Sequence, residues 1–247
     1  FWIGTCVGNV SYWVLIKSTL GAFFPVFGDG NTLTAVVVAS VMVWAFHFLI
    51  LRGVQGAAGI NKIVTIAKIV PLLLFVVVLL FNFDAQTFAD NLWGGAGTEK
   101  TFGSIWTQVR QTMLVTVFVF IGIEAASVYS RYAIKREDVG RATVIGFMIV
   151  TGLLVAVTVL SFGVLPREEI AAMRAPSVAG VLAAMVGPWG AKFISAGLIV
   201  SVLGAYLAWS LLAAEVPYLA AKYGLFPKYF EKTNEAKVPV NSLLLTN

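Results

Sequence analysis

Long apolar runs, separated by short polar or glycine-containing connections, dominate the chain. Six runs are long enough to be membrane-spanning helices, namely residues 1–24, 32–51, 63–81, 105–129, 142–165 and 191–221, and a seventh begins near residue 238. A bilayer core about 30 Å thick requires about 20 apolar residues in a helix. A shorter apolar stretch, 178–186, ends at GPWG, where Pro188 and the glycines break it. The pattern predicts an all-α integral membrane protein whose multi-span helical bundle forms one transmembrane domain over residues 1–247.

Composition points the same way and narrows the chemistry. The chain is 59% hydrophobic and 12% charged, and its mean hydropathy is +0.90, whereas soluble domains carry about 25% charged residues. The single cysteine, Cys6, excludes a disulfide framework, and no Cys and His cluster has metal-ligand spacing, so we expect no metal and no cofactor. The single histidine, His47, lies inside an apolar run, either as a tolerated polar residue on a helix face or as a proton relay.

The two ends of the sequence fall inside apolar runs. Phe1 opens the chain in the middle of such a run without an initiating methionine, and NSLLLTN closes it at the start of another. We therefore expect an internal piece of a longer protein. A signal peptide is not expected, because it needs a charged start before a short apolar core.

Lysine and arginine alternate between the connections in the way expected of a multi-pass protein. Three connections are rich in them and hold Arg52 and Lys62, then Arg131, Lys135, Arg136 and Arg141, then Lys222, Lys228, Lys232 and Lys237. The intervening connections hold fewer, namely Lys100, Arg167, Arg174 and Lys192. Because cytoplasmic loops retain positive charge, both ends of the chain are predicted to be cytoplasmic. The net charge of +5 then reflects topology, and nucleic acid is not an expected partner.

A carboxylate lies deep inside the fourth predicted span, in the stretch VFVFIGIEAAS. About 10 Å of helix separates Glu124 from Arg131 at about 1.5 Å per residue, so the carboxylate cannot reach the interface. Gly122 stands two residues before it. Transporters with internal repeats interrupt a span at this depth, so that freed backbone groups contact the substrate. The alternative is that Gly122 only allows a neighbouring helix to pack closely.

Two further residues lie away from the ends of their spans. Trp209 is about 20 Å of helix from Lys222, deeper than an interfacial tryptophan, so its indole either packs in the bundle or faces a cationic ligand. Asn9 is a polar amide in the first span, which either bonds to a neighbouring helix or faces a ligand.

Taken together, these stretches resemble a known transporter family. The match runs essentially end to end and is carried by WIGTCVGNVSYW, FGDGNT, HFLILRGVQGAAGINKI, FVFIGIEAASVYSR followed by KREDVGRATVIG, and GLIVSVLGAYLAWSLLAAEVPYLAAKYGLFP. The sequence resembles the amino acid-polyamine-organocation superfamily, in its basic amino acid/polyamine antiporter branch, and is most similar to the arginine/ornithine antiporters there. The resemblance implies a five-plus-five inverted-repeat fold with a broken helix near Gly122. This chain would supply only part of that fold, from the third span to the start of the ninth, and would lack the span that holds the substrate carboxylate.

The resemblance assigns roles around the break. Phe118 matches an aromatic that closes over the substrate from the periplasmic side, although some relatives have tryptophan there. The backbone carbonyls of Ile121 and Phe118 match those that receive the substrate α-amino group. Glu124 matches a carboxylate linked to gating and proton sensitivity.

The remaining assignments concern the side chain of the substrate. Trp209 matches the aromatic that stacks on the aliphatic or guanidinium part of the substrate. Asn9, with the backbone of Gly4 and Thr5, matches the pocket for the distal cationic end. The roles implied for the side chains of Glu124, Trp209 and Asn9 fall on residues already singled out by their depth in the spans.

The function that follows from the resemblance is exchange of cationic amino acids, arginine inward for ornithine outward, by alternating access in the cell (inner) membrane. Lysine/cadaverine and arginine/agmatine remain alternative substrate pairs. The expected partners are the small-molecule substrate and the lipid bilayer, and the resemblance also allows a homodimer.

Three other functions compete with exchange. A proton-coupled amino acid permease would use Glu124 as proton carrier. A non-transporting membrane or sensing subunit would tolerate changes at Trp209 and Glu124. A membrane-embedded enzyme would need a second carboxylate, a histidine or a nucleophile at matched depth, and none is evident, so no enzyme is expected.

Overall fold

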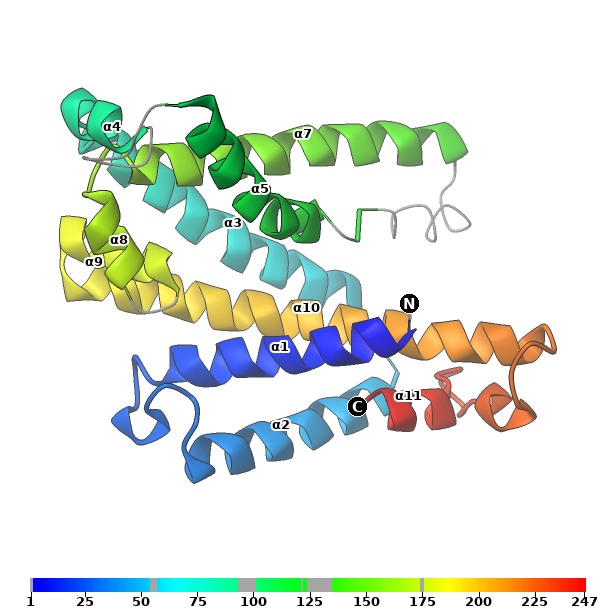
Figure 1. Cartoon of the computed structure of the whole chain (residues 1–247). Coiled ribbons are helices and arrows are strands. Elements are labelled where there is room, and N and C mark those ends of the chain that lie inside the picture. Colours follow the sequence, from blue (N-terminus) through cyan, green and yellow to red (C-terminus); the bar gives the residue numbers. More distant parts are fainter. Residues whose placement is uncertain (1, 54–56, 93–100, 121, 124–134, 174–175) are drawn as a thin grey trace. The chain divides into compact units, whose positions relative to one another are not determined.

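A computed structural model gives the fold of residues 2–53, 57–92, 101–120, 122–123, 135–173 and 176–247. Over these residues the secondary structure is helical, with one isolated β-bridge between Thr233 and Pro239. The helices are α1 (Trp2–Leu20), η1 (Pro25–Phe27), α2 (Leu33–Leu51), α3 (Ala57–Phe81), α4 (Ala85–Leu92), α5 (Phe102–Phe120), α7 (Arg136–Ser161), α8 (Arg167–Ala172), α9 (Ser177–Val186), α10 (Pro188–Lys222), η3 (Lys228–Glu231) and α11 (Val240–Thr246) (Figure 1).

Within the part of the chain that the structure describes, four segments are long and apolar enough to cross a membrane, namely Leu33–Leu51, Ile63–Phe81, Glu137–Ser161 and Pro188–Lys222. The predicted class, an all-α multi-span membrane protein, is confirmed for the described residues. Several helix bounds differ from the expected spans for local reasons. α7 begins at Arg136, ahead of the expected residue 142, because Glu137 and Asp138 in its first turn suit the positive end of the helix dipole. α10 begins at Pro188, since proline fits the first position of a helix.

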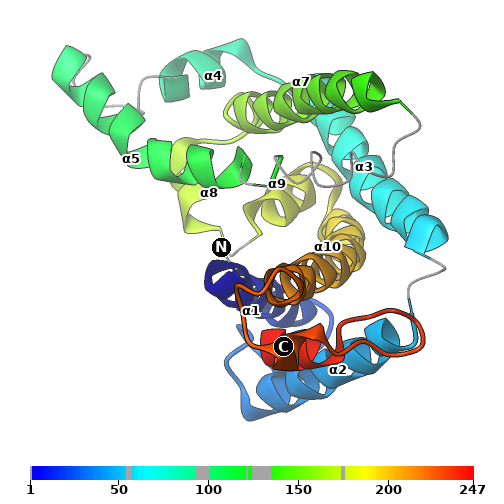
Figure 2. The ribbon, with the colours of Figure 1, turned by 90° about the vertical axis from the view of Figure 1, so that its right-hand side faces the viewer.

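The chain divides into two compact units, Phe1–Leu73 with Met173–Asn247, and Leu74–Ala172. In the first unit α10 is the central element and contacts α1, α9, α11 and η3, as Figure 2 shows in a view along α10. The core between these helices contains Trp13, Ile16, Val202 and Tyr206. α1 and α10 are thus packed directly against each other, and they carry four of the predicted site residues.

Small residues on α10 allow close approach of the first part of α3. A Cβ atom added at Gly197 would lie 2.6 Å from Cγ of Pro71, and one added at Gly204 would overlap the side chain of Val64. Helices in membranes pack through such small residues, because lipid supplies no hydrophobic force between them. Gly204 is therefore needed for its size.

The second unit contains a short helix, α4, where the sequence predicted only a polar loop. The carboxylate of Asp84 caps it by accepting from both the backbone N–H and the hydroxyl of Thr87, each at 2.7 Å. These hydrogen bonds favour the charged form and lower the pKa of the Asp84 carboxyl. The connection from α7 to α8 holds the helix in place, because Nδ2 of Asn91 donates to the carbonyl oxygens of Phe162 at 2.7 Å and Leu165 at 2.9 Å.

Candidate functional site

The amide of Asn9 is buried between α1 and α10. Its side chain is 5% exposed, and Nδ2 donates to Oγ of Ser210 at 3.2 Å. Among the residues that the structure describes, Oδ1 of Asn9 has no hydrogen-bond partner. A buried acceptor without a donor is costly, so this oxygen is suited to accept from a group that enters the bundle.

Trp209 lies on α10, the helix that holds the hydrogen-bond partner of Asn9. Ser210, the hydrogen-bond partner of Asn9, is the residue that follows Trp209 on α10. The indole is half-buried, which leaves part of its surface accessible. The amide oxygen of Asn9 and the indole of Trp209 therefore lie on two helices that pack together, and both kinds of group attract a cation.

Gly4 and Thr5 lie on α1, about one turn before Asn9. Gly4 is exposed, and a Cβ atom added there would meet nothing within 4 Å. Thr5 is half-buried and, at four residues from Asn9, lies on the same side of the helix. The first unit thus contains the four predicted residues on α1 and α10.

The break predicted near Gly122 coincides with the end of α5. The helix ends at Phe120, and Gly122 has φ 104, a left-handed value that favours glycine. The backbone N–H of Ile123 lies 3.5 Å from the carbonyl oxygen of Phe120, in a turn that replaces the regular helical ladder.

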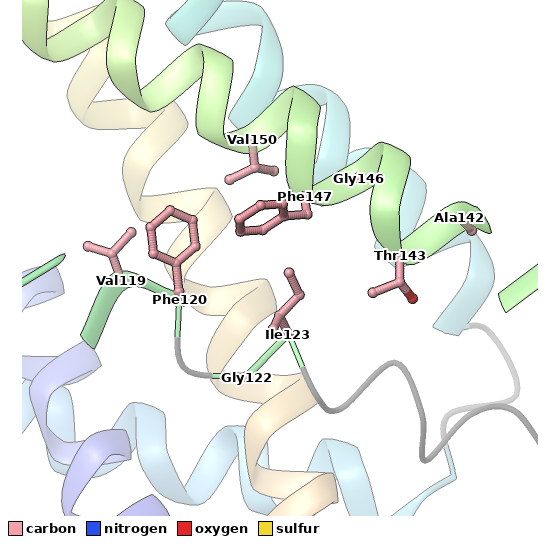
Figure 3. A pocket seen from close by; sticks show the side chains of 9 residues that line it. All are labelled: Val119, Phe120, Gly122, Ile123, Ala142, Thr143, Gly146, Phe147 and Val150. Carbon is pink, nitrogen blue, oxygen red and sulfur yellow. The ribbon is translucent and has the colours of Figure 1, made fainter. Parts of the chain in front are cut away.

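A cavity of about 320 Å³ lies beside this turn, between the end of α5 and α7. Figure 3 shows Phe120, Ile123 and Phe147 directed into this space. The rings of Phe120 and Phe147 have centroids 5.3 Å apart. Apart from Thr143, the residues lining the cavity are apolar or glycine, so it gives the end of α5 room without supplying a charged contact.

Some predicted residues fall outside what the structure describes. Ile121 and Glu124 are outside the described residues, as is the side chain of Phe118. Gly122 belongs to the second compact unit, whereas Asn9 and Trp209 belong to the first. The residues at the break and the residues on α1 and α10 therefore belong to different compact units.

Four polar residues that were not predicted as site residues form hydrogen bonds in the first unit. Besides Ser210, they are His47, Tyr206 and Asn247. One signal in the sequence was available, because Tyr206 and Ser210 are four residues apart and so share a face of α10. The partners on other helices follow from tertiary packing and had no such signal. No three His, Cys, Asp or Glu side chains gather as metal ligands within the described part of the chain.

Comparison with known proteins decides the family. The sequence profile of the amino acid permease family matches residues 1–247. The chain belongs to this family. The predicted resemblance to amino acid transporters is thereby confirmed, and the membrane setting of a permease agrees with the apolar helices.

Several relatives of this permease are named after cationic substrates. An arginine/ornithine antiporter of Pseudomonas aeruginosa is 52% identical over 247 residues, which is 100% of this chain and 51% of that protein. An arginine/agmatine antiporter of Chlamydia pneumoniae is 41% identical over 100% of this chain and 52% of its own length. An L-lysine transport protein of Corynebacterium glutamicum is 46% identical over 92% of this chain and 45% of its own. The chain spans about half the length of these relatives, all of which are named as transporters rather than enzymes.

Proposed function

We propose that the full-length permease exchanges cationic amino acids, arginine inward for ornithine outward, by alternating access in the cell membrane. The observation that carries this proposal is 52% identity, over the whole chain, to a protein named an arginine/ornithine antiporter. It is supported by the buried Oδ1 of Asn9, which lacks a partner among the described residues and belongs to an amide hydrogen-bonded to α10, the helix that also carries Trp209.

In this proposal, the distal cation of the substrate enters between Asn9 and Trp209. The amide oxygen accepts a hydrogen bond from the guanidinium or ammonium group, and the indole face attracts its charge. Cation–π attraction contributes about 2 kcal/mol or more where the pair is desolvated. Gly4 and Thr5 complete this end of the pocket with their backbone groups.

The α-amino end of the substrate is assigned to the break after α5. We place it at the carbonyl groups of Phe118 and Ile121, with the Phe118 ring closing over it and Gly122 providing the break. Glu124, which follows the break in the sequence, sets the charge along the path and so influences when it opens. Both ends of the chain are placed on the cytoplasmic side, and a homodimer is the proposed assembly.

Exchange requires that the empty carrier changes state slowly, so that return needs a counter-substrate. A substrate can shift the equilibrium only through contacts that differ between the two states. The aromatic groups of Phe118 and Trp209 are the proposed sites of such contacts, because they can close over the ligand in one state and release it in another.

The test is uptake of radiolabelled arginine by the full-length protein in vesicles that contain ornithine, unlabelled arginine, agmatine, lysine, cadaverine or no substrate. Exchange predicts uptake with internal ornithine or arginine and little into empty vesicles. Trp209→Leu should abolish it, whereas Trp189→Leu, which changes an indole 54% exposed at the start of the same helix, should not. Uptake into empty vesicles that follows an imposed proton gradient, and is lost in Glu124→Gln, would instead indicate a proton-coupled permease.

The relatives themselves motivate a second substrate pair. The protein named an L-lysine transport protein is 46% identical to this chain, so lysine is the alternative substrate that we propose. Uptake of arginine that is driven better by internal lysine or cadaverine than by ornithine would favour it.

A further inference from the structure

Three polar side chains meet in the first compact unit, one each from α2, from α10 and from the residue after α11. None of them is a predicted site residue. His47 on α2 is 3% exposed and Tyr206 on α10 is 2% exposed. The hydroxyl of Tyr206 donates to Oδ1 of Asn247 at 3.0 Å. Nδ2 of Asn247 lies 3.2 Å from Nδ1 of His47. The amide that follows α11 therefore bridges α10 and α2.

The donors and acceptors of this cluster are mutually consistent. With the amide oxygen facing the Tyr206 hydroxyl, Nδ2 of Asn247 faces the imidazole of His47. An amide nitrogen only donates, so Nδ1 of His47 accepts and the ring carries its proton on Nε2. Each of these three polar groups thus forms a hydrogen bond with another of them, as polar groups in an apolar interior require.

The cluster connects to Asn9 through α10. Tyr206 and Ser210 are one turn apart on the same face of that helix, and Ser210 accepts from Asn9 at 3.2 Å. Ser210 is 0% exposed. Polar groups on α1, α2 and the residue after α11 are therefore connected through Tyr206 and Ser210 of α10. A rotation of α10 that displaced Tyr206 from Asn247 would also move Ser210 away from Asn9.

We propose, on the basis of the exchange function above, that His47, Asn247 and Tyr206 are positioning residues for substrate binding. They fix the rotation of α10, and this rotation presents Ser210 to Asn9 and Trp209 to the substrate cation. None of the three contacts the ligand. Their effect is to keep the Asn9 amide oriented so that Oδ1, and not Nδ2, faces the incoming donor.

The test measures arginine–ornithine exchange by the full-length protein with variants of this cluster. His47→Leu and Tyr206→Phe are each expected to raise the KM for arginine about fivefold, a modest coupling between sites, with a smaller change in maximal rate. His47→Asn should restore most of the affinity, because its amide oxygen can accept where Nδ1 does. Since both changes act through the same amide, the double variant should be little worse than the poorer single variant.

A matched control and a second variant distinguish a positioning role from a purely structural one. Tyr229→Phe removes a hydroxyl from a tyrosine that is 54% exposed and should leave KM unchanged. If His47→Leu does not accumulate in the membrane, Tyr206→Phe, which loses one oxygen atom, carries the same test. A fall in maximal rate at unchanged KM, or full additivity, would show a structural role only and overturn the inference. Absence of exchange in the wild-type protein would refute the proposed function instead.

Discussion

At the scale of single residues, the central feature is the half-satisfied amide of Asn9. Nδ2 is held by Ser210 at 3.2 Å, while Oδ1 is buried without a partner among the described residues. Leaving a buried acceptor unpaired costs about 1–3 kcal/mol. In the proposed site, a bound cationic group that donates to this oxygen would recover that cost, so the amide would favour the loaded state over the empty one.

Replacement of the amide is the corresponding prediction. Asn9→Leu should raise the KM for arginine about tenfold or more, because a hydrogen bond to a charged group contributes about 1.5–3 kcal/mol. Uptake at a series of arginine concentrations measures it. Asn31→Leu, in an exposed connection, is the control and should keep the wild-type KM. An unchanged KM in Asn9→Leu would remove this residue from the binding site.

At the scale of elements, the end of α5 combines a left-handed glycine with an adjacent cavity. Gly122 has φ 104, and the cavity beside it measures about 320 Å³. A β-carbon at such a backbone conformation costs about 1–2 kcal/mol. The cavity gives Phe120 and Ile123 space in which to rearrange without distorting α7.

Gly122→Ala is therefore expected to slow exchange about tenfold. Strain of this size at the break would persist while substrate is bound and raise the barrier to the change of state, and about 1.4 kcal/mol of added barrier lowers a rate tenfold. Initial rates of counterflow measure the effect. Gly152→Ala is the matched control, since Gly152 lies in the regular part of α7 and a Cβ atom there would meet nothing within 4 Å. Equal rates in the two variants would mean that the left-handed residue has no part in transport.

The cap of α4 makes a prediction about pH. Hydrogen bonds from Thr87 lower the pKa of the Asp84 carboxyl. A carboxyl with a lowered pKa in the folded state stabilises the fold above its ordinary pKa, and this contribution is lost as the pH falls through the lowered value. The protection factor of the Thr87 amide against hydrogen exchange should therefore drop on acidification. Asp84→Asn, which caps without titrating, should remove the pH dependence, and a drop of the same size in that variant would contradict the assignment.

The helices also show which features of the fold and the candidate site can be predicted from sequence and which cannot. The length and hydropathy of the apolar runs predicted the helical class, and the depth of Asn9 and Trp209 in their spans singled out both residues before any contact was known. The partner of Asn9 was not predictable, because Ser210 lies 201 positions away and only packing brings them together. α4 was missed, because its cap and the bonds of Asn91 matter more than the weak helical tendency of a short polar segment.

At the scale of the whole molecule, the chain covers about half of its relatives. The Pseudomonas aeruginosa antiporter is matched over 51% of its length. In the proposed site, the partner for the substrate carboxylate is expected from outside these 247 residues. The cation end and the carboxylate end of the proposed site thus come from different parts of the full-length protein.

The 247-residue chain alone should therefore show no exchange after reconstitution, although its helices insert. Ornithine-dependent arginine uptake by this chain and by the full-length protein, at equal amounts of inserted protein, makes the comparison. Uptake by the shorter chain at the full-length rate would place the entire site within these residues.

Coupled exchange itself is tested most directly by a dual-label experiment. Vesicles holding the full-length protein and labelled ornithine are placed in differently labelled arginine, with the proton gradient collapsed by an ionophore. The proposed mechanism predicts that arginine enters as ornithine leaves, in equal amounts and at an unchanged rate without the gradient. Arginine entry that continues without ornithine exit, or that stops when the gradient is collapsed, would contradict it.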